Sequence, residues 1–175
     1  MNVPNALSLL RLALVVPLML TLRAGRTDLA AGLLAAALVT DLLDGALARR
    51  MGLATELGRV LDPVADKVLV AGALVALAST GQVPLQLAAI VIARDVALVA
   101  TAWVRFRGGA PVPSATPVGK VAFGVLGGYL AGVVLGISWP GWIPAFVGAA
   151  YVVAGVSYAT RMPRVFFGRV LKEER

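Results

Sequence analysis

The stretch from Asp41 to Asp66 decides the fold, and it reads DLLDGALARRMGLATELGRVLDPVAD. Asp41 and Asp44 are three residues apart, and Asp62 and Asp66 are four residues apart. On helices, either spacing places both carboxylates of a pair on the same face. The connection between the pairs is short and basic, so the two helices are expected to be antiparallel neighbours. Their acidic faces should then meet at one end of the helix pair.

The sequence outside this stretch is strongly apolar. Of the 175 residues, 59% are hydrophobic and 14% are charged, and the mean hydropathy is +0.89. Soluble domains are nearer half apolar and a quarter charged, so the composition predicts an all-α integral membrane protein. Six apolar stretches, each close to the roughly 20 residues that cross a bilayer, are expected to be transmembrane helices. They lie near 5–22, 29–48, 60–79, 84–104, 118–137 and 142–160, and residues 1–175 are expected to form a single membrane domain.

The positions of the cations predict the orientation in the membrane. Cations gather after the second and fourth stretches and in the tail, at Arg49, Arg50, Arg59, Arg105, Arg107, Arg161, Arg164, Arg169, Lys172 and Arg175. The turns at 79–83 and 138–141 carry no charge, although Arg23 and Arg26 are exceptions to this division. Because cytoplasmic loops are enriched in Lys and Arg, both termini and the acidic cluster are expected on the cytoplasmic side. The net charge of +7 is therefore interpreted as a topology and lipid-binding signal, and no nucleic acid is expected as a partner.

Four aspartates in membrane-spanning helices are energetically expensive. Each costs about 2.5–3.5 kcal/mol at a helix centre and less near the helix ends. The total is on the order of 10 kcal/mol, comparable to the stability of a whole domain. Like charges placed together add to this cost unless a positive charge lies between them. The set is therefore interpreted as a carboxylate cage for one or two divalent cations, and its oxygen ligands favour Mg²⁺ or Mn²⁺.

Other interpretations of the charged residues remain open. Asp62 precedes Pro63, so it is alternatively the N-cap of a helix with proline at its first position. Asp41 and Asp44 are alternatively interfacial residues paired with Arg49. A small membrane transporter is the alternative function from another class, because intramembrane charges often mark ion pathways. The chain has no histidine and no cysteine, which excludes imidazole and thiolate chemistry.

The acidic stretch follows one spacing pattern, made by Asp41, Asp44, Gly45, Ala48, Arg49, Gly58, Asp62 and Asp66. This pattern resembles the signature of the CDP-alcohol phosphatidyltransferase family, with each of its fixed positions filled. Asn5, Ser8 and Arg11 are similar to the N-terminal element of the phosphatidylglycerolphosphate synthase and eukaryote-like cardiolipin synthase branches of this family. Arg94-Asp95 and Gly119-Lys120 also resemble these two branches, so the resemblance covers most of the chain.

The resemblance implies six transmembrane helices, a homodimer and an active site that faces the cytoplasm, and the expected location is the bacterial cell (inner) membrane. It implies an enzyme of phospholipid biosynthesis that transfers a phosphatidyl group from CDP-diacylglycerol to an alcohol hydroxyl and releases CMP. Two Mg²⁺ or Mn²⁺ ions would be held by Asp41, Asp44, Asp62 and Asp66. The CDP-binding residues would be Asp41, Asp44, Gly45, Ala48, Arg49 and Gly58. Asp66 would also be the catalytic base, and a carboxylate is the remaining good proton acceptor in a chain without His or Cys.

Three cations in the second half of the chain are the candidate acceptor-binding residues, Arg94, Arg105 and Lys120. Arg94 is costly within an apolar helix, and it is expected to pair with Asp95 only imperfectly because adjacent helical residues diverge. Arg94 and Arg105 are eleven residues apart, close to three helical turns, and so share a face. Together with Lys120 they would form a phosphate pocket. Alternatively, Arg105 and Lys120 are interfacial anchors.

The favoured acceptor is glycerol 3-phosphate, and phosphatidylglycerol is the alternative. Many phosphatidylglycerolphosphate synthases carry a further arginine about eight residues after the first, at the position where this chain has Ala102. The Arg94-Asp95 stretch is more similar to the cardiolipin synthase branch. Both acceptors therefore stay open at the level of sequence.

Overall fold

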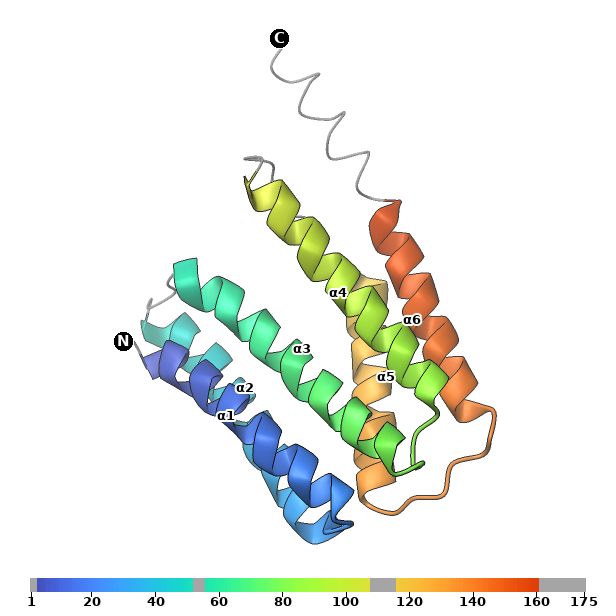
Figure 1. Cartoon of the computed structure of the whole chain (residues 1–175). Coiled ribbons are helices and arrows are strands. Elements are labelled where there is room, and N and C mark those ends of the chain that lie inside the picture. The colour runs from blue at the N-terminus through green and yellow to red at the C-terminus, as the bar shows by residue number, and fades with distance from the viewer. Residues whose placement is uncertain (1–2, 52–55, 108–115, 161–175) are drawn as a thin grey trace. The chain divides into compact units, whose positions relative to one another are not determined.

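The computed structural model describes residues 3–51, 56–107 and 116–160, and within these ranges the side chains other than those of 3–5, 7, 41–51, 56–63 and 106. The described residues form six helices and no strand (Figure 1). The helices are α1 (Val3–Arg23), α2 (Thr27–Met51), α3 (Glu56–Ser79), α4 (Leu85–Arg107), α5 (Pro117–Val134) and α6 (Ile143–Ala159). The predicted all-α class is confirmed, and each helix overlaps one of the six apolar stretches.

The end of α2 and the start of α3 lie beyond the predicted limits of the second and third apolar stretches. α2 continues to Met51 and α3 begins at Glu56, so both helices include charged residues. Arg and Glu are good helix formers, and a helix does not have to end where its apolar sequence ends. Asp62 therefore lies within the second turn of α3, and the interpretation of Asp62 as an N-cap is wrong.

Three helices end in the same glycine-dependent motif. Gly25, Gly81 and Gly136 follow α1, α3 and α5, with φ angles of 66°, 75° and 76°. In each case the residue after the glycine donates its backbone N–H to the carbonyl oxygen of the residue four positions before the glycine. These hydrogen bonds are 2.8–3.0 Å long. This Schellman arrangement favours glycine because other side chains are strained at positive φ. Since Gly136 closes α5, the helix ends at Val134, three residues before the end expected near residue 137.

The first of two compact units comprises residues 1–88 and 130–138, and it contains α1, α2 and α3. In this unit α1 contacts both α2 and α3. The buried residues of α1 recur at intervals of three and four, at Ser8, Arg11, Val15, Leu18 and Leu22. This spacing forms one stripe along a helix. Arg11 therefore lies among the core residues of the unit.

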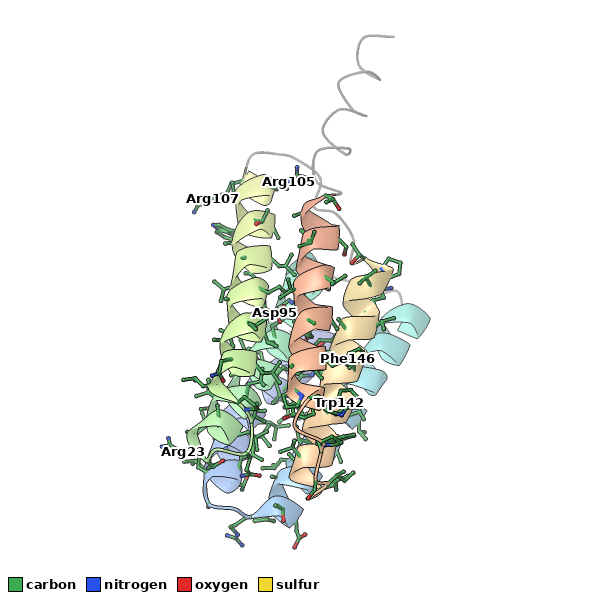
Figure 2. All side chains as sticks on the ribbon, turned by 90° about the vertical axis from the view of Figure 1, so that its right-hand side faces the viewer. Arg23, Asp95, Arg105, Arg107, Trp142 and Phe146 are labelled. Carbon is green, nitrogen blue, oxygen red and sulfur yellow. The ribbon has the colours of Figure 1, made fainter. Side chains whose placement is uncertain are left out.

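The second compact unit comprises residues 89–129 and 139–175, and it contains most of α4 and α5 and all of α6. Figures 1 and 2 both show α6 beside α4. The buried residues of α6 also form a stripe, at Val147, Tyr151, Ala154 and Tyr158. Asp95 is buried on α4, and Figure 2 places it about midway along that helix. Both units thus enclose charged side chains within mostly apolar surroundings.

Two helices among the described residues are long and apolar enough to cross a bilayer, namely Leu85–Arg105 within α4, and α5. Two shorter helical segments, Thr27–Thr40 and Ile143–Ala159, are also apolar. Large apolar side chains are exposed on several helices, for example Leu20 and Val104, which are 63% and 68% exposed. Lipid is the solvent that favours such a surface. The six predicted spans and the cytoplasmic termini stay predictions.

Candidate active site

Helices α2 and α3 carry all eight positions of the acidic signature. The backbone of α2 holds Asp41, Asp44, Gly45, Ala48 and Arg49, and that of α3 holds Gly58, Asp62 and Asp66. Only the side chain of Asp66 lies within the described ones. Both aspartate pairs stand on continuous helix, so the prediction that each pair shares a helical face is supported by the backbone. The meeting of the two acidic faces lies outside the described side chains and stays a prediction.

Asp66 is joined to α1 by an ion pair. Nη1 of Arg11 donates a hydrogen bond to Oδ1 of Asp66 over 2.5 Å. The arginine side chain is 1% exposed, whereas the aspartate side chain is 32% exposed. Hydrogen bonds between charged groups at such distances are among the strongest in proteins. The predicted base is therefore partly open, and its arginine partner is enclosed.

A close approach farther along the same helices determines how α1 lies on α3. A Cβ atom on Gly72 of α3 would lie 2.8 Å from Cγ1 of Val15 and 3.3 Å from Sδ of Met19, both on α1. Since Arg11 meets Asp66 and Val15 meets Gly72, the two helices run parallel. A side chain at residue 72 would force the helices to shift. Gly72 thus permits the register that brings Arg11 to Asp66.

A second arginine–aspartate pair lies within α4. Nη1 of Arg94 donates to Oδ1 of Asp95 over 2.6 Å, and both side chains are largely buried. The expectation of imperfect pairing is wrong, because the long arginine side chain reaches its neighbour even though the Cα–Cβ bonds of adjacent helical residues diverge. The guanidinium carbon of Arg94 also lies 5.2 Å from the ring centre of Tyr151 on α6, which is a cation–π contact.

The start of α5 adjoins the same arginine. Oγ1 of Thr116 accepts the N–H of Gly119 over 3.0 Å, so Thr116 acts as the N-cap and Pro117 is the first helical residue. The same hydroxyl lies 3.4 Å from Oγ of Ser157 on α6. A Cβ atom on Gly119 would lie 3.4 Å from Nη2 of Arg94. The guanidinium of Arg94 is therefore beside the first turn of α5.

The other two predicted acceptor residues differ in their distance from Arg94. Lys120 lies in the first turn of α5, next to Gly119, and it is exposed. Arg105 lies eleven residues beyond Arg94, about 16 Å along the helix axis. Figure 2 places Arg105 at the C-terminal end of α4. The structure thus brings Arg94 to the turn that carries Lys120 and leaves Arg105 three turns away.

Two buried polar atoms of this cluster have no hydrogen-bond partner among the described residues. They are Nε of Arg94 and the hydroxyl oxygen of Tyr151, whose residue is 0% exposed. An unsatisfied buried group typically costs about 1–3 kcal/mol. The N-terminus of α5 adds the positive end of a helix dipole beside the same guanidinium. The cluster therefore has one guanidinium N–H and one phenol hydroxyl that are free of hydrogen bonds to the described residues.

Sequence reasoning missed the contacts made by Arg11 and Tyr151. Arg11 was identified only as part of a motif, although an arginine between Ser8 and Val15 on an apolar stripe signals a buried cation that needs an anion. Tyr151 was not identified, and no local pattern marks it. Its place becomes visible only when α6 lies against α4.

The ligand chemistry of the acidic signature fits a hard divalent cation. Carboxylates are the negatively charged ligands that the chain offers to such a site, since it has no cysteine to supply a thiolate and no histidine to supply an imidazole. Among the described side chains no three acidic groups lie together, and Asp41, Asp44 and Asp62 are outside that description. Asp66 is partly open and is paired with Arg11, and its carboxylate is the type of ligand that Mg²⁺ and Mn²⁺ prefer.

Comparison with known proteins agrees with these features. The profile of the CDP-alcohol phosphatidyltransferase family matches residues 1–160. The chain is 33% identical over 174 residues to the "Probable phosphatidylglycerophosphate synthase" of Mycobacterium tuberculosis, which covers 93% of this chain and 82% of that protein. It is 35% identical over 184 residues to a cardiolipin synthase (CMP-forming) of Streptomyces coelicolor, with 94% and 84% covered.

A third relative extends the comparison to another bacterium. The chain is 33% identical over 135 residues to a CDP-diacylglycerol–glycerol-3-phosphate 3-phosphatidyltransferase of Bacillus subtilis, and the match covers 69% of each chain. These matches give the transporter interpretation no support. The signature on α2 and α3, the profile match over most of the sequence and the similar enzymes show that the chain belongs to the CDP-alcohol phosphatidyltransferase family, whose members are transferases of phospholipid synthesis.

Proposed function

We propose that the enzyme transfers the phosphatidyl group of CDP-diacylglycerol to a hydroxyl of glycerol 3-phosphate and releases CMP. The observation that carries this proposal is the complete eight-position signature on α2 and α3, with Asp66 held by Arg11. The similarity to the phosphatidylglycerophosphate synthase of Mycobacterium tuberculosis and the glycerol-3-phosphate 3-phosphatidyltransferase of Bacillus subtilis supports the choice of glycerol 3-phosphate.

The donor site is proposed to use the signature residues. Asp41, Asp44, Asp62 and Asp66 would hold two Mg²⁺ or Mn²⁺ ions, which when bound neutralise the diphosphate and stabilise the leaving phosphate. The CDP part of the donor would be held by Asp41, Asp44, Gly45, Ala48, Arg49 and Gly58. The small residues among them leave a flat or bulky group room to approach the helix backbone.

Asp66 is proposed to accept the proton of the attacking hydroxyl. The hydroxyl oxygen forms a bond to the phosphorus that carries diacylglycerol, and the bond from this phosphorus to the phosphate oxygen of CMP breaks. The proton passes to the carboxylate of Asp66, and CMP leaves with the bonding electron pair. A carboxylate is suited to this role when its position is fixed, because general base catalysis depends first on geometry.

The acceptor phosphate is proposed to bind at Arg94. This guanidinium is oriented by Asp95, stacked on Tyr151 and placed beside the first turn of α5. Lys120 would add a second cation from that turn, and Arg105 a third from the end of α4. The buried hydroxyl of Tyr151 offers a hydrogen bond to a hydroxyl of the acceptor.

Cardiolipin synthesis is the second candidate function, with phosphatidylglycerol as the acceptor. The similarity to the cardiolipin synthase of Streptomyces coelicolor over 94% of this chain favours it. So does Ala102, which stands where a second arginine would contribute to binding a free phosphate. The chemistry at Asp66 is the same for both acceptors, and only the acceptor site differs.

One assay tests the reaction and separates the two acceptors. Purified enzyme in detergent is supplied with CDP-diacylglycerol and Mg²⁺ or Mn²⁺, and CMP is quantified with glycerol 3-phosphate, with phosphatidylglycerol and without acceptor. We expect CMP release with glycerol 3-phosphate and a lipid product that still carries the phosphate. Release of CMP with phosphatidylglycerol but not with glycerol 3-phosphate would assign cardiolipin synthesis. No release with either acceptor would refute the proposed reaction.

The enzyme is proposed to be a homodimer in the bacterial inner membrane, with six spans, one domain over 1–175, cytoplasmic termini and an active site that faces the cytoplasm. The family profile supports one domain because it covers parts of both units. Figure 2 places Arg105 and Arg107 at one end of the second unit and Trp142 and Phe146 at the other. A basic end is typical of a cytoplasmic side, and Trp residues are enriched at both membrane interfaces.

Cysteine labelling tests this topology, since the natural chain has no cysteine. Gln82→Cys and Ser138→Cys lie in turns predicted to be outside, and Thr160→Cys follows α6 on the predicted cytoplasmic side. A membrane-impermeant maleimide should label the first two variants in intact cells and the third only after permeabilisation. The opposite pattern would reverse the orientation. Light scattering of the purified enzyme in detergent measures whether it is a dimer.

A further inference from the structure

Arg11 is more deeply buried than any other charged side chain among the described residues, with 1% of its surface exposed. It lies on the core stripe of α1, between Ser8 and Val15. Proteins tolerate a buried charge when it is paired, and Arg11 is paired with Asp66 of α3. The position of this arginine is therefore tied to one of the proposed metal ligands.

The two partners of this pair differ in exposure. The guanidinium is enclosed, whereas Asp66 keeps 32% of its side chain exposed. An enclosed arginine has few rotamers available, so Nη1 offers a fixed point at 2.5 Å from Oδ1 of Asp66. Fixing one oxygen of a carboxylate restricts the rotation of the whole group. The open part of Asp66 is thereby held in one orientation.

The contact between α1 and α3 fixes the position of the Arg11 guanidinium relative to Asp66. Val15 lies one turn after Arg11 and approaches Gly72 so closely that a Cβ there would be 2.8 Å from Cγ1 of Val15. Val15 is β-branched and therefore stiff at its first side-chain torsion. The contact between α1 and α3 thus holds Arg11 level with Asp66.

We propose that Arg11 is a positioning residue that holds the carboxylate of Asp66 in the orientation required to bind metal and to accept the proton of the acceptor. The inference rests on the proposed function, in which Asp66 has both roles. Groups that hydrogen-bond to metal ligands typically contribute about 10–100-fold to metal affinity or activity. Arg11 acts through Asp66 and not on the substrate.

The sign of one measurement separates this role from a purely structural one. The positive charge of Arg11 repels a nearby cation, so its removal should tighten metal binding if the pair only links α1 to α3. If Arg11 positions Asp66, its removal should weaken metal binding despite the loss of repulsion. The change in metal affinity therefore has opposite directions under the two explanations.

The experiment measures Mn²⁺ binding to the purified full chain without substrates, by the electron paramagnetic resonance signal of the free ion. Arg11→Met removes the charge and the donor at similar volume, and Arg23→Met is the control on the same helix, where Arg23 is exposed (Figure 2). We expect Arg11→Met to weaken Mn²⁺ binding about 10–100-fold and to lower kcat of CMP release. With Mn²⁺ at a saturating concentration, the KM for CDP-diacylglycerol should stay within about twofold, and the control should resemble the natural enzyme.

Unchanged or tighter Mn²⁺ binding in Arg11→Met would overturn the proposal. So would a raised KM for CDP-diacylglycerol at unchanged Mn²⁺ affinity, which would mean that Arg11 contacts the donor. If Arg11→Met fails to fold, Arg11→Lys decides, because it keeps the charge but not the planar fork. If Arg11 positions Asp66, Arg11→Lys should bind Mn²⁺ more weakly than the natural enzyme. If the pair only links α1 to α3, Arg11→Lys should bind Mn²⁺ with unchanged affinity. Mn²⁺ binding does not require turnover, so failure of the natural enzyme to release CMP would refute only the proposed reaction.

Discussion

Arg11 and Asp66 join α1 to α3 across fifty-five residues of sequence, whereas Arg94 and Asp95 are adjacent residues of α4. In the first pair the arginine is enclosed and the aspartate is open. In the second pair both partners are largely buried, and the arginine has further contacts with Tyr151 and the first turn of α5. The two ion pairs therefore contain the same residue types in different roles. In one pair the arginine orients an aspartate, and in the other the aspartate orients an arginine.

This difference separates the two halves of the proposed reaction. Asp66 belongs to the signature that would hold metal and donor, and Arg94 belongs to the cluster that would bind the acceptor phosphate. Variants of the first pair should therefore change metal binding and kcat. Variants of the second should change the KM for the acceptor.

The largest effect is expected from Asp66→Asn. The amide cannot accept the proton, so CMP release should fall about 10²–10⁴-fold. Binding of CDP-diacylglycerol, measured by equilibrium dialysis with labelled donor, should be largely preserved. Asp95→Asn is the matched control, and its kcat should stay within about tenfold of the natural enzyme because Asp95 acts on the acceptor side. Turnover of Asp66→Asn at the natural rate would remove Asp66 as the base.

Arg94→Ala should raise the KM for glycerol 3-phosphate about 10–100-fold, because a hydrogen bond to a charged group contributes about 1.5–3 kcal/mol. The KM for CDP-diacylglycerol should change little. Initial rates at varied concentrations of each substrate measure both constants. Equal weakening of both substrates would break the division between the two arginine–aspartate pairs. An unchanged KM for glycerol 3-phosphate would place the acceptor phosphate elsewhere.

Gly72→Ala tests the register that supports the first pair. The added methyl group would lie 2.8 Å from Cγ1 of Val15, and such overpacking typically costs about 1–3 kcal/mol. We expect a lower Tm and weaker Mn²⁺ binding. Gly32→Ala on α2 is the control, because no heavy atom lies within 4 Å of its Cβ position. An unchanged Tm in Gly72→Ala would show that α1 and α3 separate at little cost.

The smallest effect is expected from Tyr151→Phe. The ring and its cation–π contact with Arg94 remain, and the lost hydroxyl has no partner among the described residues. The Tm should be unchanged or slightly higher, and the KM for glycerol 3-phosphate should rise by a factor corresponding to about 0.5–1.5 kcal/mol. Tyr158→Phe, from the same buried stripe, is the control. A rise in Tm without any change in KM would exclude a hydrogen bond from Tyr151 to the acceptor.

The parts of this molecule that sequence reasoning predicted depend on local rules. The spacing of Asp41, Asp44, Asp62 and Asp66 is readable because three or four residues make one helical turn. The apolar lengths indicated six helices, and six helices are present in the described residues. The family could be predicted because its signature is compact in sequence, and the profile match confirms this assignment.

The parts that sequence reasoning missed depend on packing or on side-chain reach. The partner of Asp66 requires knowledge that α1 packs against α3 in the register that brings Arg11 to Asp66, and no local pattern specifies this. The pairing of Arg94 with Asp95 was underestimated because Cα–Cβ directions say little about where a long side chain ends. The end of α5 was misplaced because the turn signal at 139–141 concealed the earlier stop at Gly136.

The three glycines with positive φ have a consequence for how this enzyme can vary. Gly25, Gly81 and Gly136 all belong to the first unit, and each lies two residues after the end of a helix whose last carbonyls it helps to satisfy. A β-carbon at such a position costs about 1–2 kcal/mol. Random mutagenesis should therefore deplete replacements at these three codons, although less strongly than at an acidic ligand, and the depletion should persist in a selection for membrane insertion alone. Intolerance to mutation in this protein thus has two separate origins, and only one of them reports on catalysis.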